Sequence, residues 1–269
     1  MRHFTYQYGS LSDAGDVRGE NQDAILCCTG EKNTQNQQND AAFFLVADGM
    51  GGLSYGSQIS AYCTNQFAAW WHEDFSQMIQ AGRDSDTDIK ELLEQEIWDI
   101  NTQIYQFKER EGCRCGSTLS ALLLYNGKYY IENLGDSRIY RFRKNNLEQL
   151  TKDQSLAAQL VREKRLTPEE AEDFPQKNVL TMCIGMFQIP QSGFEMGELK
   201  NGDMFLLCSD GFYGCVEEAD VKEILRRYNR QNDKGNGILR FAVEKLRSLI
   251  PEGAARDNVS LILTEVRIG

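Results

Sequence analysis

Four aspartates stand at the ends or starts of predicted apolar strands. Asp48 follows the run 43–47, Asp136 follows 129–134, Asp210 follows 204–209, and Asp257 precedes 259–263. In an antiparallel sheet the end of one strand lies beside the start of the next. We therefore expect these carboxylates, although far apart in the chain, to share one rim of a sheet structure.

Carboxylates that converge at one rim repel each other, so they either take up protons or bind cations. The chain has only 2 histidines, and ligand sets made of oxygen atoms favour Mg²⁺ or Mn²⁺ over zinc. Glycine follows both Asp48 and Asp210, which removes side-chain bulk beside the acids. A single Asp-Gly pair is more simply a turn, but four acids tied to apolar strands favour a metal site.

Composition limits the possible partners. The chain has 269 residues and a net charge of −11, which disfavours nucleic-acid binding because phosphate backbones are repelled. No apolar run is long enough to span a bilayer, and the first ten residues contain no apolar signal-peptide region. We expect a cytoplasmic protein with no membrane partner.

Eight cysteines without an export signal are typical of reduced thiols. The two close pairs are Cys113-Arg114-Cys115 and Cys27-Cys28, and neither has the two-residue gap of a zinc site. Four others lie among apolar residues and are expected to pack in the core, namely Cys63, Cys183, Cys208 and Cys215.

Hydrophobic periodicity predicts where the helices and strands lie. Spacings of three and four predict amphipathic helices over 57–78 and 88–110, and helical patterns recur over 155–174, 217–228 and 237–249. We expect Trp70, Trp71 and Trp98 to pack in the core or between helices rather than to line a ligand site. Asn126-Gly127 predicts a tight hairpin between strands 118–125 and 128–133, and further strands are expected over 24–28, 41–47, 138–143, 147–150, 204–208 and 259–266. The polar stretch 30–40 is expected to be a long hairpin loop.

Long helices separated from hairpin-linked strands favour an α+β fold over a parallel doubly wound sheet. The strands are too numerous for one sheet, so we expect two antiparallel sheets packed face to face, with helices outside.

Seven short motifs, in order, resemble those of one family. They are SDAG…RGENQD (12–15 and 18–23), VADGMGG (46–52), CGST (115–118), GDSR (135–138), LTKD (150–153), LCSDG (207–211) and RDNVS (256–260). Over nearly its whole length the chain resembles the metal-dependent protein Ser/Thr phosphatases, the PPM or type 2C family, of bacterial type. The resemblance implies a four-layer α-β-β-α sandwich, with residues 1–269 forming one catalytic domain and a flap at about 155–180.

The resemblance also implies a site. Asp48 would bridge two Mn²⁺ or Mg²⁺ ions, the Gly49 carbonyl would bind one of them, and Asp210 and Asp257 would complete the first ion's ligands. Asp136, with Asp210, would hold a third ion.

The remaining roles concern the substrate. Asp23 would orient the attacking water, and Arg18 would grip the substrate phosphate, although an isolated arginine is more simply a surface residue. The implied reaction is hydrolysis of phosphoserine or phosphothreonine in proteins by an activated water, without a phosphoenzyme. The implied partner is a phosphorylated protein substrate in a signalling system, in which a Ser/Thr kinase adds the phosphate that this protein removes. We expect the protein to be a monomer.

Three residues depart from the family pattern. Met50 replaces the histidine of animal-type members, Gln154 stands where bacterial members usually carry histidine, and Met182 stands where arginine is common. Two alternatives are open, the first motivated by Gln154 and Met182 and the second because the sequence separates it poorly from a protein phosphatase. One is a pseudophosphatase that binds a phosphoprotein without turnover, and the other is a metal phosphohydrolase that acts on a small molecule.

Overall fold

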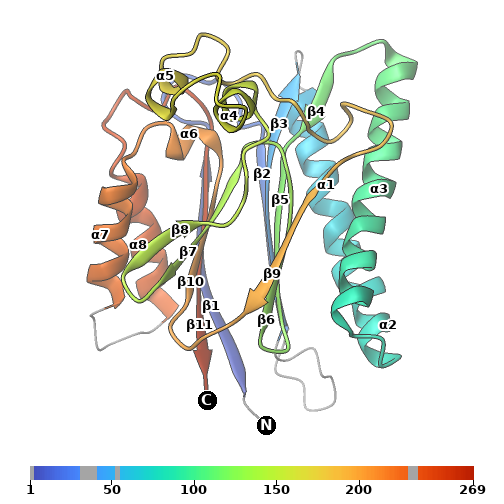
Figure 1. Ribbon diagram of the computed structural model, residues 1–269. Helices are drawn as coiled ribbons and strands as arrows, with labels where there is room; N and C mark the ends of the chain where they lie inside the picture. The colour runs from blue at the N-terminus through green and yellow to red at the C-terminus, as the bar shows by residue number, and fades with distance from the viewer. Residues whose placement is uncertain (1–2, 31–40, 52–54, 230–235) are drawn as a thin grey trace.

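The chain folds into two antiparallel sheets that face each other, with helices on both outer faces (Figure 1). The computed structural model describes residues 3–30, 41–51, 55–229 and 236–269. The polar stretch 31–40, predicted to be a hairpin loop, lies outside the described residues, but the strands on either side of it pair antiparallel. The expected α+β sandwich of four layers is confirmed.

The first sheet has the strand order β1-β11-β10-β7-β8, and the second has β2-β3-β5-β6-β9 with β4 paired to β3. The strands of the first sheet are β1 (Phe4–Asp13), β11 (Val259–Ile268), β10 (Met204–Cys208), β7 (Arg138–Arg143) and β8 (Asn146–Gln149). Those of the second are β2 (Asp23–Thr29), β3 (Ala41–Gly51), β5 (Leu119–Tyr125), β6 (Lys128–Leu134), β9 (Gly193–Glu198) and β4 (Cys115–Ser117).

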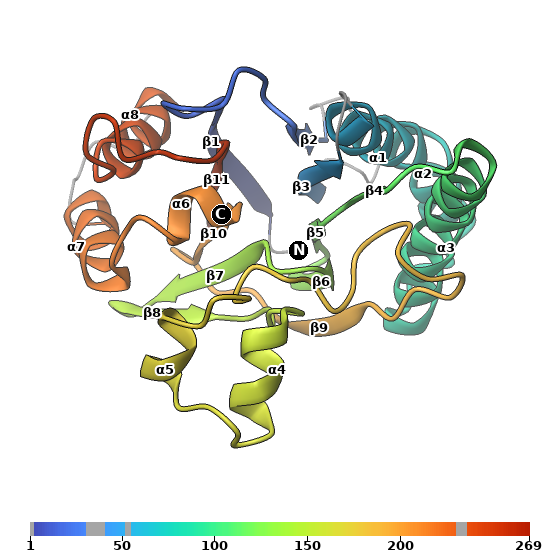
Figure 2. The same cartoon turned by 90° about the horizontal axis from the view of Figure 1, so that it is seen from above.

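The helices form two outer layers and a small projection at one end (Figures 1 and 2). The second sheet is covered by α1 (Tyr55–His72), α2 (Asp74–Gln80) and α3 (Asp86–Glu111), and the first by α7 (Glu218–Asn229) and α8 (Asn236–Arg247). The projection contains α4 (Leu156–Arg162) and α5 (Pro168–Glu172), and α6 (Asp210–Tyr213) is a single turn after β10.

Three apolar clusters hold the four layers together. Phe44, Phe205 and Ile262 belong to the cluster between the sheets. The neighbouring residue Phe43 faces the opposite way and packs with Phe67 of α1. A third cluster joins the first sheet to α7 and α8. Because successive residues of a strand point to opposite faces, strands buried on both faces appear in the sequence as continuous apolar runs.

The sheet topology brings the ends of four key strands to one rim, at the top of Figure 1. Both β3 and β6 run antiparallel to β5, so they end at the same edge. In the other sheet the end of β10 lies beside the start of β11, where Cys208 pairs with Leu261. The strand-end aspartates are therefore carried to a common edge, as the antiparallel argument requires.

Local sequence patterns correctly predicted the positions of most helices and strands. Asn126 and Gly127 have φ angles of 47° and 76°, the left-handed conformation of a tight hairpin turn. Helix α3 begins at a capping box formed by Ser85 and Asp88. The predicted helix 57–78 is divided into α1 and α2 at Glu73, and the predicted helix 155–174 is divided into α4 and α5 by a turn in which Lys164 has a φ of 59°.

The prediction that Trp98 packs in the core is wrong. Trp70 and Trp71 are buried, but the Trp98 side chain is 41% exposed. Helix α3 buries Ile97 and Ile100, and Trp98 lies about 100° around the helix from Ile97. None of the described helices has the length and apolar character needed to cross a membrane.

One acid in the core leads to a stability prediction. Glu132 of β6 is fully buried, and neither carboxyl oxygen makes a hydrogen bond of normal geometry within the described residues. Burial raises the pKa of the Glu132 carboxyl to about 7, against a smaller opposite effect of the Ser192 hydroxyl. In the unfolded chain this carboxyl has its ordinary pKa of 4.5. Between these two values the folded state holds a proton that the unfolded state has lost, so stability falls as pH rises through this range.

We expect Glu132→Gln to stabilise the protein at pH 8, by up to about 3 kcal/mol, because the glutamine remains neutral. At pH 4.5 the gain should nearly vanish, since the folded wild-type carboxyl is then protonated. Urea unfolding at the two pH values measures the difference, with Glu91→Gln, at an exposed residue of α3, as the matched control. An equal gain at both pH values would contradict a buried, protonated Glu132.

Candidate metal and phosphate site

The rim opens into a pocket of about 450 Å³ that the strand-end acids line together. The acids of both sheets contribute to it: Asp48, Asp136, Asp210 and Asp257. Its remaining walls come from the backbone around Asp48, from Arg18 and from the segment after α5. The structure thus brings together the four carboxylates that the sequence separates by up to 209 residues (257 − 48).

Asp48 is held rigidly by its own backbone. Its N–H donates to Thr118 Oγ1 at 2.9 Å, and its carbonyl accepts from the N–H of Thr118 at 2.8 Å and from Ser117 Oγ at 3.1 Å. Loss of hydration, together with the facing carboxylates of Asp23 and Asp210, raises the pKa of Asp48 well above its usual range. The carboxylate is therefore fixed where negative charge is most concentrated.

Glycine is required after two of these acids because neighbouring backbone approaches very closely. A Cβ on Gly49 would lie 2.1 Å from the Gly56 carbonyl oxygen, and one on Gly211 would lie 2.0 Å from that of Asn258. Real Cβ atoms do not tolerate such contacts. The glycines thus let the start of α1 and the residue before β11 pack against the acid-bearing turns.

Asp136 lies in the crossing from β6 to β7 and is only 7% exposed. Burial, reinforced by Asp210 and Asp153, raises its pKa to about 7. The turn before it is fixed by Gln154, whose backbone N–H donates to the Gly135 carbonyl and whose Oε1 accepts the Gly135 N–H, both at 2.9 Å.

Asp23 lies behind the pocket rather than on its wall. It stands directly opposite Asp48 across β2 and β3 and is 8% exposed. Ser209 Oγ donates to its Oδ2 at 2.8 Å, while its buried Oδ1 has no hydrogen-bond partner among the described residues. Burial raises the pKa of Asp23 to about 6.

Arg18 lies at the mouth of the pocket, with its side chain 56% exposed. Its Nη2 donates to Asp257 Oδ2 at 2.8 Å. This hydrogen bond and the Asp257 charge raise the pKa of the Arg18 guanidinium, so it is permanently positive. The arginine and the acids therefore face the same space.

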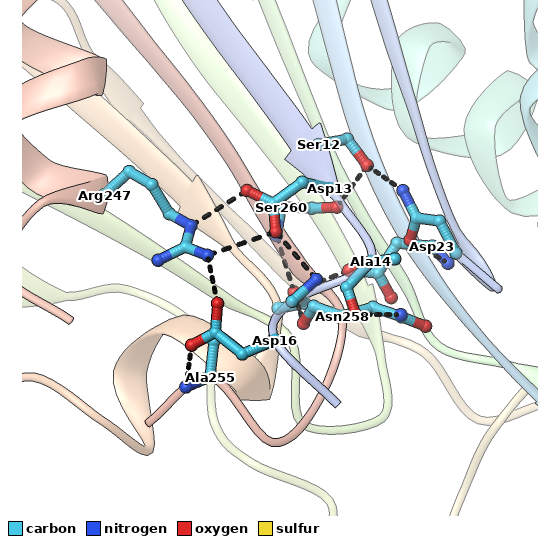
Figure 3. A network of polar contacts seen from close by, with 12 residues as sticks. Ser12, Asp13, Ala14, Asp16, Asp23, Arg247, Ala255, Asn258 and Ser260 are labelled. Atoms are coloured by element: carbon cyan, nitrogen blue, oxygen red, sulfur yellow. Dashed lines mark hydrogen bonds and ion pairs between the residues drawn. The ribbon is translucent and has the colours of Figure 1, made fainter. Parts of the chain in front are cut away.

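The loop that carries Arg18 is tied down by a polar network (Figure 3). Asn258 donates through Nδ2 to the carbonyls of Ala14 and Glu20, at 3.1 and 2.9 Å. Arg247 of α8 donates to Asp13 at 2.8 Å and lies 3.9 Å from Asp16. Asn258, the residue before β11, thus holds both ends of the loop, and α8 of the outer helix layer holds its first end.

The donor set fits Mg²⁺ or Mn²⁺, which prefer carboxylate and carbonyl oxygens. Among the residues with described positions, no three acidic, histidine or cysteine side chains converge on a single point. Carboxylates of like charge are expected to keep apart from one another. The Asp257 side chain is turned toward Arg18. Bound cations would offset the loss of hydration and the mutual repulsion that raise the pKa values of Asp48, Asp136 and Asp210.

Sequence reasoning missed part of the site. Asn178 and Leu180 of the expected flap 155–180, and Met186 beyond it, line the pocket, and no local pattern marks these three residues individually. Thr118 and Asn258 lie within the quoted motifs, but only the structure shows them fixing Asp48 and the Arg18 loop.

The structure shows what surrounds the three residues that depart from the family pattern, Met50, Met182 and Gln154. Met50 lines the pocket with its Sδ 3.9 Å from Cys183 Sγ, so it offers no proton there. Met182 packs against the apolar cluster beneath the helices. Gln154 uses both ends of its side chain, because its Nε2 also donates to the Gln191 carbonyl at 3.0 Å.

We expect Gln154→Ala to destabilise the fold by about 1–3 kcal/mol, because it leaves the buried Gly135 N–H without an acceptor. Activity should fall as well, since the Asp136 turn and the segment 155–180 are both anchored at this residue. Urea unfolding and turnover measure the two effects. The matched control is Gln159→Ala, whose side chain donates only to the exposed Glu163. Equal behaviour of the two variants would rule out the anchoring role.

Comparisons with known proteins agree with this geometry. The protein phosphatase PhpP of Streptococcus pneumoniae is 30% identical over 233 residues, covering 86% of this chain and 89% of PhpP. The serine/threonine phosphatase stp of Listeria welshimeri is 28% identical over 256 residues, covering 94% of this chain and 93% of stp.

Solved structures show the same architecture. The serine/threonine phosphatase of S. agalactiae superposes with a TM-score of 0.82 at 27% identity, over 97% of this chain and 99% of that one. The catalytic domain of the protein phosphatase PstP, in complex with two manganese ions, gives a TM-score of 0.77 at 26% identity, over 98% and 99%. Residues 18–249 match the protein phosphatase 2C family, and the chain therefore belongs to that family.

Proposed function

We propose that this protein is a metal-dependent phosphatase that hydrolyses phosphoserine and phosphothreonine in proteins. The observation that carries the proposal is the pocket in which carboxylates from both sheets and one arginine face the same space. The family and the named phosphatase activity of its relatives support it.

The acids would hold the metal ions. Asp48 would bridge two of them, with the Gly49 carbonyl, Asp210 and Asp257 as further ligands, and Asp136 with Asp210 would hold a third. Two manganese ions are present in the PstP structure, and we propose Mn²⁺ or Mg²⁺ here. Bound in such a pair, the ions would supply a water acidified to act near neutral pH and positive charge that offsets the phosphoryl oxygens.

The protein's own groups would position the reactants. Asp23 would orient the attacking water from behind the pocket: it stands opposite Asp48, its Oδ2 is fixed by Ser209, and its buried Oδ1 has no hydrogen-bond partner among the described residues. The Arg18 guanidinium can clamp two phosphate oxygens at once and raise affinity for the substrate. With the ions bound, their charge and that of Arg18 would attract an approaching phosphate in spite of the protein's net charge of −11.

The remaining parts of the proposal rest on family resemblance. Residues 1–269 would form a single catalytic domain. The segment 155–180 would be its flap, and the antiparallel bridge between Ser155 and Leu180 joins the two ends of that segment. The protein would act in the cytoplasm, as a monomer, on a phosphoprotein made by an opposing Ser/Thr kinase.

Hydrolysis of a phosphothreonine peptide and of p-nitrophenyl phosphate, measured with Mn²⁺, with Mg²⁺ and with chelator, tests the proposal. We expect turnover of the peptide that depends on the metal. Turnover of small phosphate esters alone would favour a small-molecule phosphohydrolase. Mn²⁺ binding without turnover of either substrate would favour a phosphoprotein-binding pseudophosphatase.

A further inference from the structure

Two thiols lie in contact beside the candidate site. Cys113 and Cys115 are separated by one residue, and their Sγ atoms are 3.5 Å apart. Cys113 is half-buried, Cys115 is buried, and neither is in a disulfide. The proposed reaction assigns them no task, and their spacing does not suit a zinc site.

The backbone around this pair can adapt. Cys113 and Arg114 form the short irregular link between Gly112, which ends α3 in the left-handed conformation, and the start of β4. The other close pair differs, because Cys27 and Cys28 are neighbours on the regular strand β2. Cys27 packs between the sheets and Cys28 packs beneath the helices, so their side chains point to opposite faces. Cys27 and Cys28 are therefore not expected to form a disulfide with each other, and they serve as an internal negative control for oxidation of a close cysteine pair.

We propose that Cys113 and Cys115 are a site of reversible oxidation, at which hydrogen peroxide converts the two thiols to a disulfide. The sulfur of Cys113 attacks one peroxide oxygen, the O–O bond breaks, and water leaves, which makes a sulfenic acid. The sulfur of Cys115 then attacks that sulfur, the S–O bond breaks, and a second water leaves. The thiols lose two electrons and two protons, and the peroxide is reduced to two waters.

The oxidised pair would act on Asp48 through three linked contacts. Forming the bond draws the sulfurs from 3.5 Å to about 2.05 Å. Cys115 pairs with Gly51 in the ladder between β4 and β3, which Figure 2 shows side by side. Two and three residues farther on, Ser117 and Thr118 hold the backbone of Asp48. A shift of β4 is therefore passed to the acid at the centre of the pocket, an effect that rests on the proposed function.

A disulfide that spans only one residue is strained, and strained disulfides are readily reduced. The modification should therefore be reversed by dithiothreitol, as a regulatory rather than a structural disulfide would be.

The experiment treats the full chain with hydrogen peroxide before any metal is added, blocks free thiols with iodoacetamide and digests with trypsin. Trypsin cleaves after Arg110, Arg114 and Lys128, so the disulfide joins peptide 111–114 to peptide 115–128. We expect this linked pair to appear and turnover to fall about 10-fold, because small displacements at a catalytic site have large effects. Dithiothreitol should reverse both changes.

Two variants make the test specific. Cys113→Ser should keep the activity of the reduced protein and lose the response to peroxide, and Cys215→Ser, at another half-buried cysteine, should keep both. The proposal is overturned if the linked peptides do not form or if Cys115 joins a different cysteine. The regulatory part is overturned if the disulfide forms without changing turnover. The mass measurement does not need an active enzyme, so it decides the modification even if the proposed function fails.

Discussion

Asp48→Asn is expected to reduce turnover of a phosphothreonine peptide by about 10⁴-fold, equivalent to about 5.5 kcal/mol in the barrier. Asn keeps the shape of Asp and the backbone contacts to Thr118 and Ser117, but it removes the charge that lies between the other acids. Because Asp48 is proposed to bridge two ions, its loss should affect both.

Stability measurements separate this effect from misfolding. Asp48 faces Asp23 and Asp210, so removing its charge relieves repulsion, and the metal-free variant should be at least as stable as the wild type. The rise in Tm that Mn²⁺ gives the wild type should largely disappear, since that rise measures binding. Asp84→Asn, at an acid bonded to Tyr125, provides the matched control. Near-normal turnover by Asp48→Asn would contradict the assignment.

Arg18→Ala is expected to lower kcat/KM for the phosphopeptide by about 10- to 150-fold, which corresponds to the 1.5–3 kcal/mol of a hydrogen bond to a charged group. The change should appear mainly in KM, because the guanidinium grips the phosphate before the reaction as well as during it. Because the Arg18 side chain is exposed at the pocket mouth, the free energy of unfolding should change little.

Two further variants distinguish geometry from charge. Arg18→Lys keeps the charge but cannot form two parallel hydrogen bonds, so it should recover only part of the affinity. Arg256→Ala removes the same charge from the exposed residue before Asp257, outside the pocket lining, and should leave KM nearly unchanged. If Arg18→Ala and Arg256→Ala raise KM equally, Arg18 has no specific contact with the phosphate.

The convergence of the acids could be predicted from the sequence because it follows from strand direction. Asp210 and Asp257 flank neighbouring antiparallel strands, and Asp48 and Asp136 end strands that are both antiparallel to β5. Long apolar runs marked those strands clearly. The positions of the side chains around them, such as Asn258 on the Arg18 loop, depend on contacts between distant segments and leave no local pattern.

The sequence patterns do not predict three strands, β1, β9 and the three-residue β4, and the first two share a physical cause. Both β1 and β9 lie at the edges of their sheets and are only partly buried. An edge strand can be held largely by main-chain hydrogen bonds, which any residue can make, so its sequence needs no continuous apolar run. Trp98 shows the reverse error, since an aromatic residue on a helix was assigned to the core without regard to its angle from the apolar stripe.

Anomalous diffraction from a crystal of this protein soaked in Mn²⁺ tests the central claim most directly. If distant aspartates form one divalent-ion site, two strong peaks should lie in the pocket, with Asp48 between them and Asp210 and Asp257 as ligands. Arg18 should then be released from Asp257. Peaks only at other surface acids, or a pocket without peaks at saturating Mn²⁺, would contradict the claim.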